Sequence, residues 1–364
     1  MDFLPEAAGP HDPVLVTGPR PAGSIRRTSN IDTARPAGLR GEAVVDARAR
    51  DLRTEADGTS VVVGEATLQA GISPTHELRW LRTSPEVGAL QELVGSGVGS
   101  GFRSRLNEIV AASWAEGADG SLLYLLLDDL PGATLVSGYA IHRAGGFDGP
   151  PAAEPAPARA TAPAPAPAPA PPPPPRPAPD FGSRGDLCAG WAHDATMMVH
   201  VRKTGSLPVP LGPPAPRLEP VDDPVAWHAM ASLTPYAVRR RRRLDLIAPT
   251  GGGDEYRIDL HFRDSHVDEH AQETVLHEYS VTGTADREAG RIGAVTARAH
   301  VLPWLECPGA VASAERISGM ALSSLRPVVR KEFVGRTTCT HLNDSLRSLA
   351  DIEALFEELV TSAP

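Results

Sequence analysis

Residues 256–262 read YRIDLHF, so apolar and polar side chains alternate along this stretch. A period of two is typical of a β-strand with one buried face. The segments 275–282 and 292–301 predict two further strands. A helix is expected after them, over about 310–333. Strands followed by helices predict an α+β region built on an antiparallel sheet.

The C-terminal part of the chain carries an apolar stripe at helical spacing. Its members recur every three or four residues: Leu342, Leu346, Leu349, Ile352, Leu355 and Leu359. This stripe predicts a helix that packs against the sheet. Thr340 is expected as its N-cap, with Asn343 at the third helical position.

An earlier region of the chain repeats this plan in outline. Three residues precede their counterparts by one constant offset: Ile31, Val45 and Arg50 against Leu244, Ile258 and Arg263. The order of these features predicts a pseudo-repeat of two similar antiparallel-sheet-plus-helix domains. Such a pair would form an intramolecular pseudo-dimer.

Proline and alanine alternate from 149 to 179, which is typical of an extended, disordered linker that buries no core. A proline-rich ligand for a recognition domain is the less favoured alternative. The expected organisation is a flexible N-terminus (1–23), a first domain (24–148), this linker (149–179), an extended connecting segment (180–236) and a second domain (237–364).

Charge and composition exclude several classes of partner. The 364-residue chain has a formal net charge of -10, which argues against nucleic acid and anionic membranes as partners. The sequence opens with no signal peptide and contains no apolar run of about 18 residues, so a cytoplasmic protein is expected. Its three cysteines, Cys188, Cys307 and Cys339, are expected to be reduced thiols.

Four segments of the second region match a known pattern in order: RDSH at 263–266, HEY at 277–279, LPWLECP at 302–308 and GRTTCTHL at 335–342. With them, residues 239–350 resemble the domain-of-unknown-function family 2889. Thr338 departs from the glycine that usually precedes the cysteine in this family. The resemblance implies where a site lies and supplies no reaction. The first region resembles the family only in outline.

These segments carry the candidate chemistry. Five residues form a nitrogen-and-sulfur donor set that could hold a zinc-like divalent metal: Cys307, Cys339, His341, His266 and His277. As an enzyme, the protein would use Cys339 as nucleophile or ligand, His341 and His266 as acid, base or ligands, and Glu306 as an orienting carboxylate. Asp264 is expected to orient His266. The nearby helix N-terminus is expected to lower the pKa of the Cys339 thiol.

A structural interpretation of the same residues stays open, with Cys339 a buried cysteine beside a capping loop and the histidines satisfied or exposed. Ser84, Leu123, Leu125 and Arg53 align with Cys307, Cys339, His341 and His266, which predicts a first region without this chemistry. Two functions therefore remain: an enzyme acting on a small organic molecule through the second region, or a non-catalytic binding or scaffold protein.

One basic run stands out at Arg239–Arg243. Nucleic-acid or phosphate binding is one interpretation of such a cluster. A structural or acidic-ligand role is favoured, because Arg26 and Arg27 repeat the feature before the first expected strand.

Overall fold

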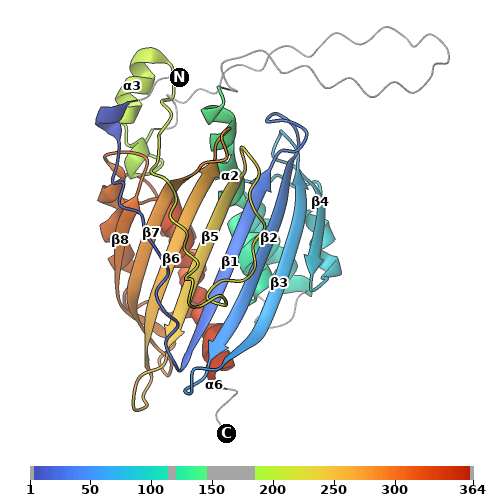
Figure 1. Ribbon diagram of the computed structural model, residues 1–364, viewed down its shortest axis with the longest axis vertical. Helices are drawn as coiled ribbons and strands as arrows, with labels where there is room; N and C mark the ends of the chain where they lie inside the picture. The colour runs from blue at the N-terminus through green and yellow to red at the C-terminus, as the bar shows by residue number, and fades with distance from the viewer. Residues whose placement is uncertain (1–3, 114–119, 146–184, 361–364) are drawn as a thin grey trace, which may run out of the picture.

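The computed structural model describes residues 4–113, 120–145 and 185–360. Its centre is one eight-stranded antiparallel sheet with strand order β4-β3-β2-β1-β5-β6-β7-β8 (Figure 1). The strands are β1 (Ser24–Ala34), β2 (Ala43–Thr54), β3 (Ser60–Ile72), β4 (Leu78–Ser84), β5 (Val238–Ile247), β6 (Glu255–Val267), β7 (Glu273–Asp286) and β8 (Arg291–Val301). The predicted α+β class and antiparallel sheet are confirmed. The expected linker, 149–179, lies outside the described residues.

The two halves of the chain meet in the middle of this sheet, where β1 pairs with β5. In this register Arg26 lies opposite Asp245, and Arg239 lies opposite Asp32. Both pairs form salt bridges, of 2.7 Å and 2.6 Å. Each half therefore supplies four neighbouring strands to one continuous sheet, and charged pairs cross the seam twice.

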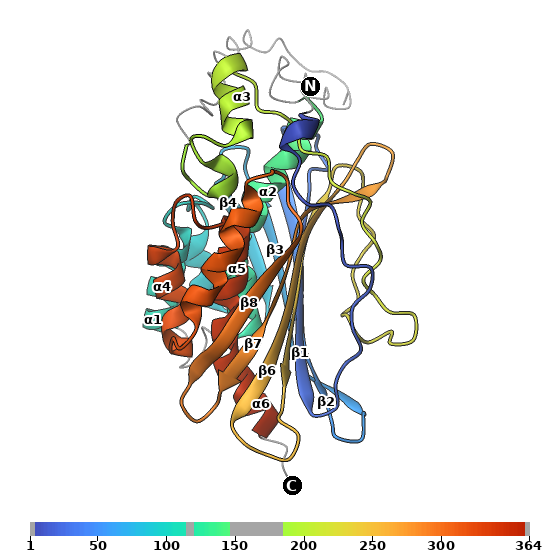
Figure 2. The same ribbon diagram turned by 90° about the vertical axis from the view of Figure 1, so that its left-hand side faces the viewer.

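The helices cover one face of the sheet (Figure 2). They are α1 (Phe102–Ser113), α2 (Leu122–Arg143), α4 (Leu325–Glu332), α5 (Thr340–Ser348) and α6 (Ile352–Val360), while α3 (Thr196–Thr204) lies near one end of the sheet. Short 3-10 helices are η1 (Pro5–Ala7), η2 (Gly88–Leu93), η5 (Ala189–Trp191), η6 (Cys307–Ile317), η7 (Leu322–Ser324) and η8 (Leu349–Asp351).

Two helix predictions need correction in detail. The helix expected over 310–333 is a 3-10 helix, η6, followed after a break by η7 and α4. Gly319 lies in the break with φ 77°, a left-handed conformation that favours glycine and interrupts a helix. The final apolar stripe forms α5 and α6 with η8 between them, so its packing face was predicted correctly although the helix is not continuous.

Apolar side chains between sheet and helices form two large clusters, one largely from each half. In the second half the cluster includes Leu260, Phe262 and Tyr279 of the sheet and Leu342 and Leu346 of α5. It also takes in Met197 and Met198 of α3, both fully buried, as their apolar side chains predict.

Extended segments cross the opposite face of the sheet (Figure 2). The Asp12 amide donates to the His300 carbonyl at 2.9 Å, and the Val275 amide donates to the Pro213 carbonyl at 2.9 Å. The Thr17 amide donates to the Leu218 carbonyl at 2.9 Å, which ties the N-terminal segment to the connecting segment. Residues assigned from sequence to a flexible N-terminus are thus hydrogen-bonded to the sheet and its neighbours.

The basic run lies within β5, and all five arginines are buried. Each is paired with a carboxylate: Arg239 with Asp32, Arg240 with Asp264 and Asp344, Arg241 with Glu219, Arg242 with Asp129, and Arg243 with Asp245 and Asp259. A buried charge needs a partner of this kind, because desolvation otherwise costs several kcal/mol. Arg240 and Arg242 thus tie the sheet to its helices, whereas the other three arginines pair with strands and the connecting segment, so the run is structural.

No helix in the described ranges combines the length and apolar character that crossing a membrane requires.

Candidate metal centre

A row of three polar side chains runs across the middle of the second half. The register places Arg240 of β5 opposite Asp264 of β6, and Asp264 opposite His277 of β7. Arg240 binds both oxygens of Asp264, with Nε–Oδ1 at 2.9 Å and Nη2–Oδ2 at 3.0 Å. His277 Nδ1 lies 3.8 Å from Asp264 Oδ2. A β-bulge follows Asp264 directly, and bulges of this kind re-aim the neighbouring side chains.

The first turn of α5 brings His341 onto this row. Its Nε2 lies 3.7 Å from Asp264 Oδ2, and its ring stacks on that of His277 with centroids 3.5 Å apart. Asp264 is fully buried, whereas the side chains of His277 and His341 are 15% and 14% exposed. Among the described residues, these three form the one group of potential ligands whose donor atoms all lie within 4.8 Å of one another.

Both histidines are held neutral. Burial lowers the pKa of His341 to about 3, with a further contribution from the Arg240 guanidinium. Burial, and then His341 itself, lowers the pKa of His277 well below its usual value. A neutral imidazole offers a nitrogen lone pair, which is the form that binds a metal. His277 Nδ1, on the Asp264 side of the ring, is buried without a hydrogen-bond partner among the described residues.

The Cys339 thiol lies next to the histidine pair, with its Sγ 3.8 Å from His341 Nδ1. Cys339 also interacts with the thiols of Cys307 and Cys188 and with the hydroxyl of Tyr279. The three cysteines therefore lie in one neighbourhood, with Cys307 at the start of η6, Cys339 just before α5 and Cys188 just before η5. Their sulfur atoms do not join the tight group of donor atoms around Asp264.

The expected activation of Cys339 is wrong in direction. Burial raises the pKa of its thiol, and this outweighs the opposing contacts with the Tyr279 hydroxyl and the backbone N–H groups of Leu342 and His341. The N-cap of α5 is Cys339, so Thr340 is the first helical residue and Asn343 the fourth. The thiol is thus next to the helix N-terminus, but desolvation dominates its protonation.

Two predicted site residues lie outside this group. His266 packs its ring against Tyr139 of α2, with centroids 5.0 Å apart. Glu306 accepts hydrogen bonds from the backbone and hydroxyl of Thr196, both at 2.7 Å, and so caps α3. Asp264 lies beside His277 and His341, at 3.8 Å and 3.7 Å. His277 is its cross-strand neighbour, and such neighbours lie about 5 Å apart, whereas alternate residues of one strand, such as Asp264 and His266, lie about 7 Å apart.

The sequence did not single out Arg240 as part of the site. Only the strand register indicates this role of Arg240, because Arg240, Asp264 and His277 become neighbours once the three strands are paired. Arg240 also binds Asp344 of α5, with Nη1–Oδ2 at 2.6 Å. This second contact fixes α5, and with it His341, against the sheet.

The fold and this site define an α+β protein with a histidine-rich centre between sheet and helices. Residues 238–355, which contain the whole centre, match the model of a family described as a protein of unknown function, DUF2889. The predicted family resemblance of the second region is therefore confirmed. No curated protein and no solved structure matches the chain.

Proposed function

We propose that the second half binds a zinc-like divalent metal ion through Asp264, His277 and His341, and that the ion serves metal-assisted chemistry on a small organic molecule. The observation that carries this proposal is the convergence of three donor atoms within 4.8 Å. Two imidazoles and one carboxylate are a donor set found at catalytic zinc sites, where a further position stays open to water or substrate.

The surroundings of the three ligands support the proposal. Asp264 is fixed by its bidentate contact with Arg240, and Asp344 in turn holds Arg240. Such second-layer contacts orient ligands and are a common feature of metal sites. The Arg240 charge also opposes a cation, so Asp264 would share one oxygen and the two histidines would carry most of the binding. A bound ion of this kind polarises a substrate oxygen or activates water.

The test is zinc affinity, measured by competition with a chromophoric chelator and checked by elemental analysis of the purified protein. We expect about one ion per chain, and a loss of affinity of at least about tenfold in His277→Ala and in His341→Ala. His270→Ala is the matched control, because His270 is 80% exposed on the turn before β7. Absence of zinc binding in the unmodified protein, or equal binding by all four proteins, contradicts the proposal.

A second candidate function is favoured by one specific observation. Cys339, His341 and Asp264 form a series in which Sγ–Nδ1 is 3.8 Å and Nε2–Oδ2 is 3.7 Å. This is the order of nucleophile, base and orienting carboxylate in thiol enzymes. Against it stand the raised pKa of the Cys339 thiol and its burial. Cys339→Ser separates the two, because it should abolish a thiol reaction and leave zinc binding within about twofold.

We also propose that the two halves are diverged copies of one unit. Support comes from matched registers: Arg27 faces Asp51 and Asp51 faces Gly64, as Arg240 faces Asp264 and Asp264 faces His277. All three positions differ by the same offset, and a bulge follows the aspartate in both rows. Counted from the helix N-caps, Ser121 and Leu123 of the first half correspond to Cys339 and His341, two residues earlier than in the sequence alignment. Superposing the two halves tests this, and different helix placement would contradict it.

A further inference from the structure

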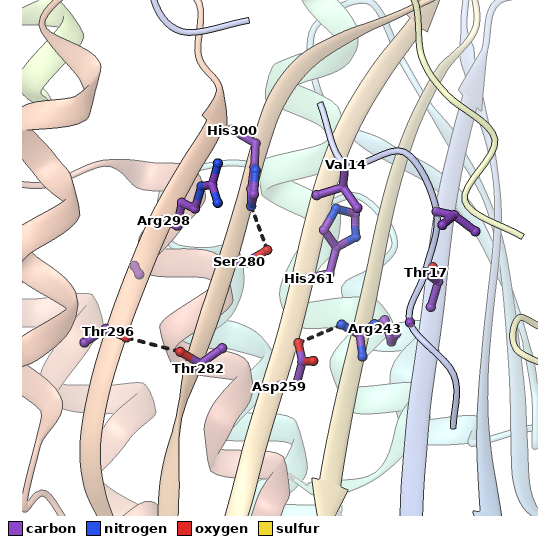
Figure 3. A pocket seen from close by; sticks show the side chains of 13 residues that line it. Val14, Thr17, Arg243, Asp259, His261, Ser280, Thr282, Thr296, Arg298 and His300 are labelled. Carbon is purple, nitrogen blue, oxygen red and sulfur yellow. Dashed lines mark hydrogen bonds and ion pairs between the residues drawn. The ribbon is translucent and has the colours of Figure 1, made fainter. Parts of the chain in front are cut away.

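A second candidate site lies on the face of the sheet opposite the helices. It is a cavity of about 370 Å³ between the N-terminal segment 14–18 and strands β5 to β8 (Figure 3). Ser280 of β7 and His300 of β8 both line it. Side chains alternate along a strand, so Ser280 lies on the other face of β7 from His277 and Tyr279. The cavity therefore shares no side chain with the proposed metal centre.

Ser280 and His300 form a hydroxyl–imidazole pair in this cavity. Ser280 Oγ lies 2.9 Å from His300 Nε2, which is hydrogen-bond distance. His300 is 8% exposed, whereas Ser280 is only partly buried and lines the open side of the pair. This is the contact that a serine nucleophile makes with its general base.

The surroundings of His300 suit the role of a base. Burial lowers the pKa of His300, so the ring is mainly neutral at pH 7. The Glu278 carboxylate, and then the Asp12 carboxylate and backbone carbonyl, favour the protonated ring that a base becomes during reaction. We assign the proton of the neutral ring to Nδ1, because Nε2 then accepts from the Ser280 hydroxyl.

Arg298 supplies a positive charge beside the pair. It stands directly opposite Ser280 in the register of β7 and β8, and it lines the same cavity. Its ion pair with Asp12, at 3.0 Å, joins side chains that are 70% and 78% exposed, so this pair contributes little. The guanidinium can therefore leave Asp12 for the oxyanion that forms when a hydroxyl attacks a carbonyl group.

Apolar side chains occupy another part of the lining. Val14, Val16 and Ala297 offer surface for a short hydrocarbon chain. The volume is near the lower end of the usual range for ligand pockets, about 300–1,000 Å³, which limits the size of the bound group. A small neutral acyl group fits this combination of a hydroxyl, a base, a cation and an apolar wall.

We propose that Ser280 and His300 hydrolyse carboxylic esters of short acyl chains. Ser280 Oγ attacks the carbonyl carbon while His300 Nε2 takes the hydroxyl proton, and Arg298 stabilises the oxyanion. The bond to the alcohol oxygen breaks, and the alcohol leaves with that proton. Water then gives a proton to His300 and attacks the acyl group on Ser280. Ser280 regains a proton as the carboxylic acid leaves, so one ester and one water yield one acid and one alcohol.

The test is hydrolysis of p-nitrophenyl acetate and p-nitrophenyl butyrate by the full chain, together with labelling by a fluorophosphonate probe. We expect hydrolysis above the rate in buffer, and a probe adduct that peptide mass spectrometry locates at Ser280. Ser280→Ala should abolish the adduct and lower kcat/KM at least about 100-fold. His300→Gln should lower kcat/KM at least about 100-fold, because the base is removed.

Thr284→Ala is the matched control, because it removes a partly buried hydroxyl from the same strand outside the cavity lining, and it should keep kcat/KM within about twofold. His277→Ala and Cys339→Ser should also retain hydrolysis, with or without a metal chelator, so this proposal and the metal proposal fail separately. Circular dichroism spectra establish that each variant is folded.

Three results would overturn the proposal: neither ester is hydrolysed above the rate in buffer, the probe leaves Ser280 unmodified, or Ser280→Ala and Thr284→Ala hydrolyse the esters equally. Loss of hydrolysis in Cys339→Ser with retention in Ser280→Ala would assign the reaction to the thiol instead.

Discussion

In each half, three residues that face one another across neighbouring strands form a row. The two rows share an arginine–aspartate pair and differ in the third residue. In the second half the row ends in His277, with His341 stacked upon it. In the first half the row Arg27–Asp51 ends in Gly64, and a Cβ at Gly64 would lie 3.3 Å from Leu122 of α2. The arginine–aspartate pair is present in both halves, so it serves the sheet. His277 and His341 have no counterpart in the row of the first half, and we propose that they hold a metal ion.

The largest predicted effect concerns the arginine–aspartate pair that both rows share. Arg240→Ala leaves Asp264 buried without its guanidinium partner, while Asp344 keeps Arg347. Arg27→Ala does the same to Asp51, while Asp351 keeps Arg326. Each change should cost about 3–5 kcal/mol in the free energy of unfolding, measured with urea. Arg298→Ala is the control, because this exposed arginine should contribute no more than about 1 kcal/mol. A loss of unfolding free energy below about 1 kcal/mol in either buried variant would contradict the view that this pair stabilises the sheet in both halves.

The next effect concerns the space at the end of the first-half row. Gly64→His introduces a ring where Leu122 already packs, and overpacking of this kind costs about 1–3 kcal/mol. Gly64→His combined with Leu122→Ala should recover part of that cost by making room. Urea unfolding of the single and double variants measures both. If Gly64→His and the unmodified protein were equally stable, Leu122 would not fill the space at the end of the first-half row.

Acid should destabilise the protein through its buried histidines. Burial lowers the pKa of His261 and His266 to about 4 and that of His341 to about 3. Below the unfolded pKa of about 6.5 the unfolded chain binds protons that the folded chain does not, so stability falls as pH falls. Between pH 6.5 and about 4 each fully shifted histidine contributes up to about 1.4 kcal/mol per pH unit.

Urea unfolding at several pH values measures this loss, and His341→Gln should reduce the slope between pH 6.5 and 4 by about one proton. A stability that is constant over this interval, or that rises toward acid, contradicts the neutral-histidine description of the second half.

The smallest effect concerns the thiols. Burial raises the pKa of Cys339 and Cys307 and raises that of Cys188 to about 12. Since the thiolate is the reactive form, iodoacetamide should label the native protein at pH 7 at least about tenfold more slowly than the urea-unfolded chain. Rapid labelling of Cys339 in the folded protein would instead favour the thiol-nucleophile function.

The sequence predicted the elements better than their pairing. Alternation located β6, β7 and β8, and the apolar stripe located the face of α5 and α6. His277, His341 and Cys339 were recognised from the family-like segments, and they do lie together. The same segments also contain His266 and Glu306, yet these two residues contact Tyr139 and Thr196.

Sequence distance explains these differences. Asp264 is two residues from His266 but one cross-strand step from His277, and only the strand register reveals which neighbour is closer. The pKa of Cys339 depends similarly on burial by residues distant in sequence, which outweighs the local helix N-terminus. Local patterns predicted the secondary structure, whereas the ligand geometry depends on tertiary packing.

The most direct test of the central claim is an anomalous difference map at the zinc edge from crystals of the protein grown with zinc. This one map compares the row that ends in His277 with the row that ends in Gly64 in the same molecule. The account predicts a peak bounded by Asp264, His277 and His341, with nitrogen and oxygen ligands at about 2.0–2.2 Å, and no peak beside Asp51 and Gly64. A map without a peak at the first position, or with equal peaks at both, would contradict it.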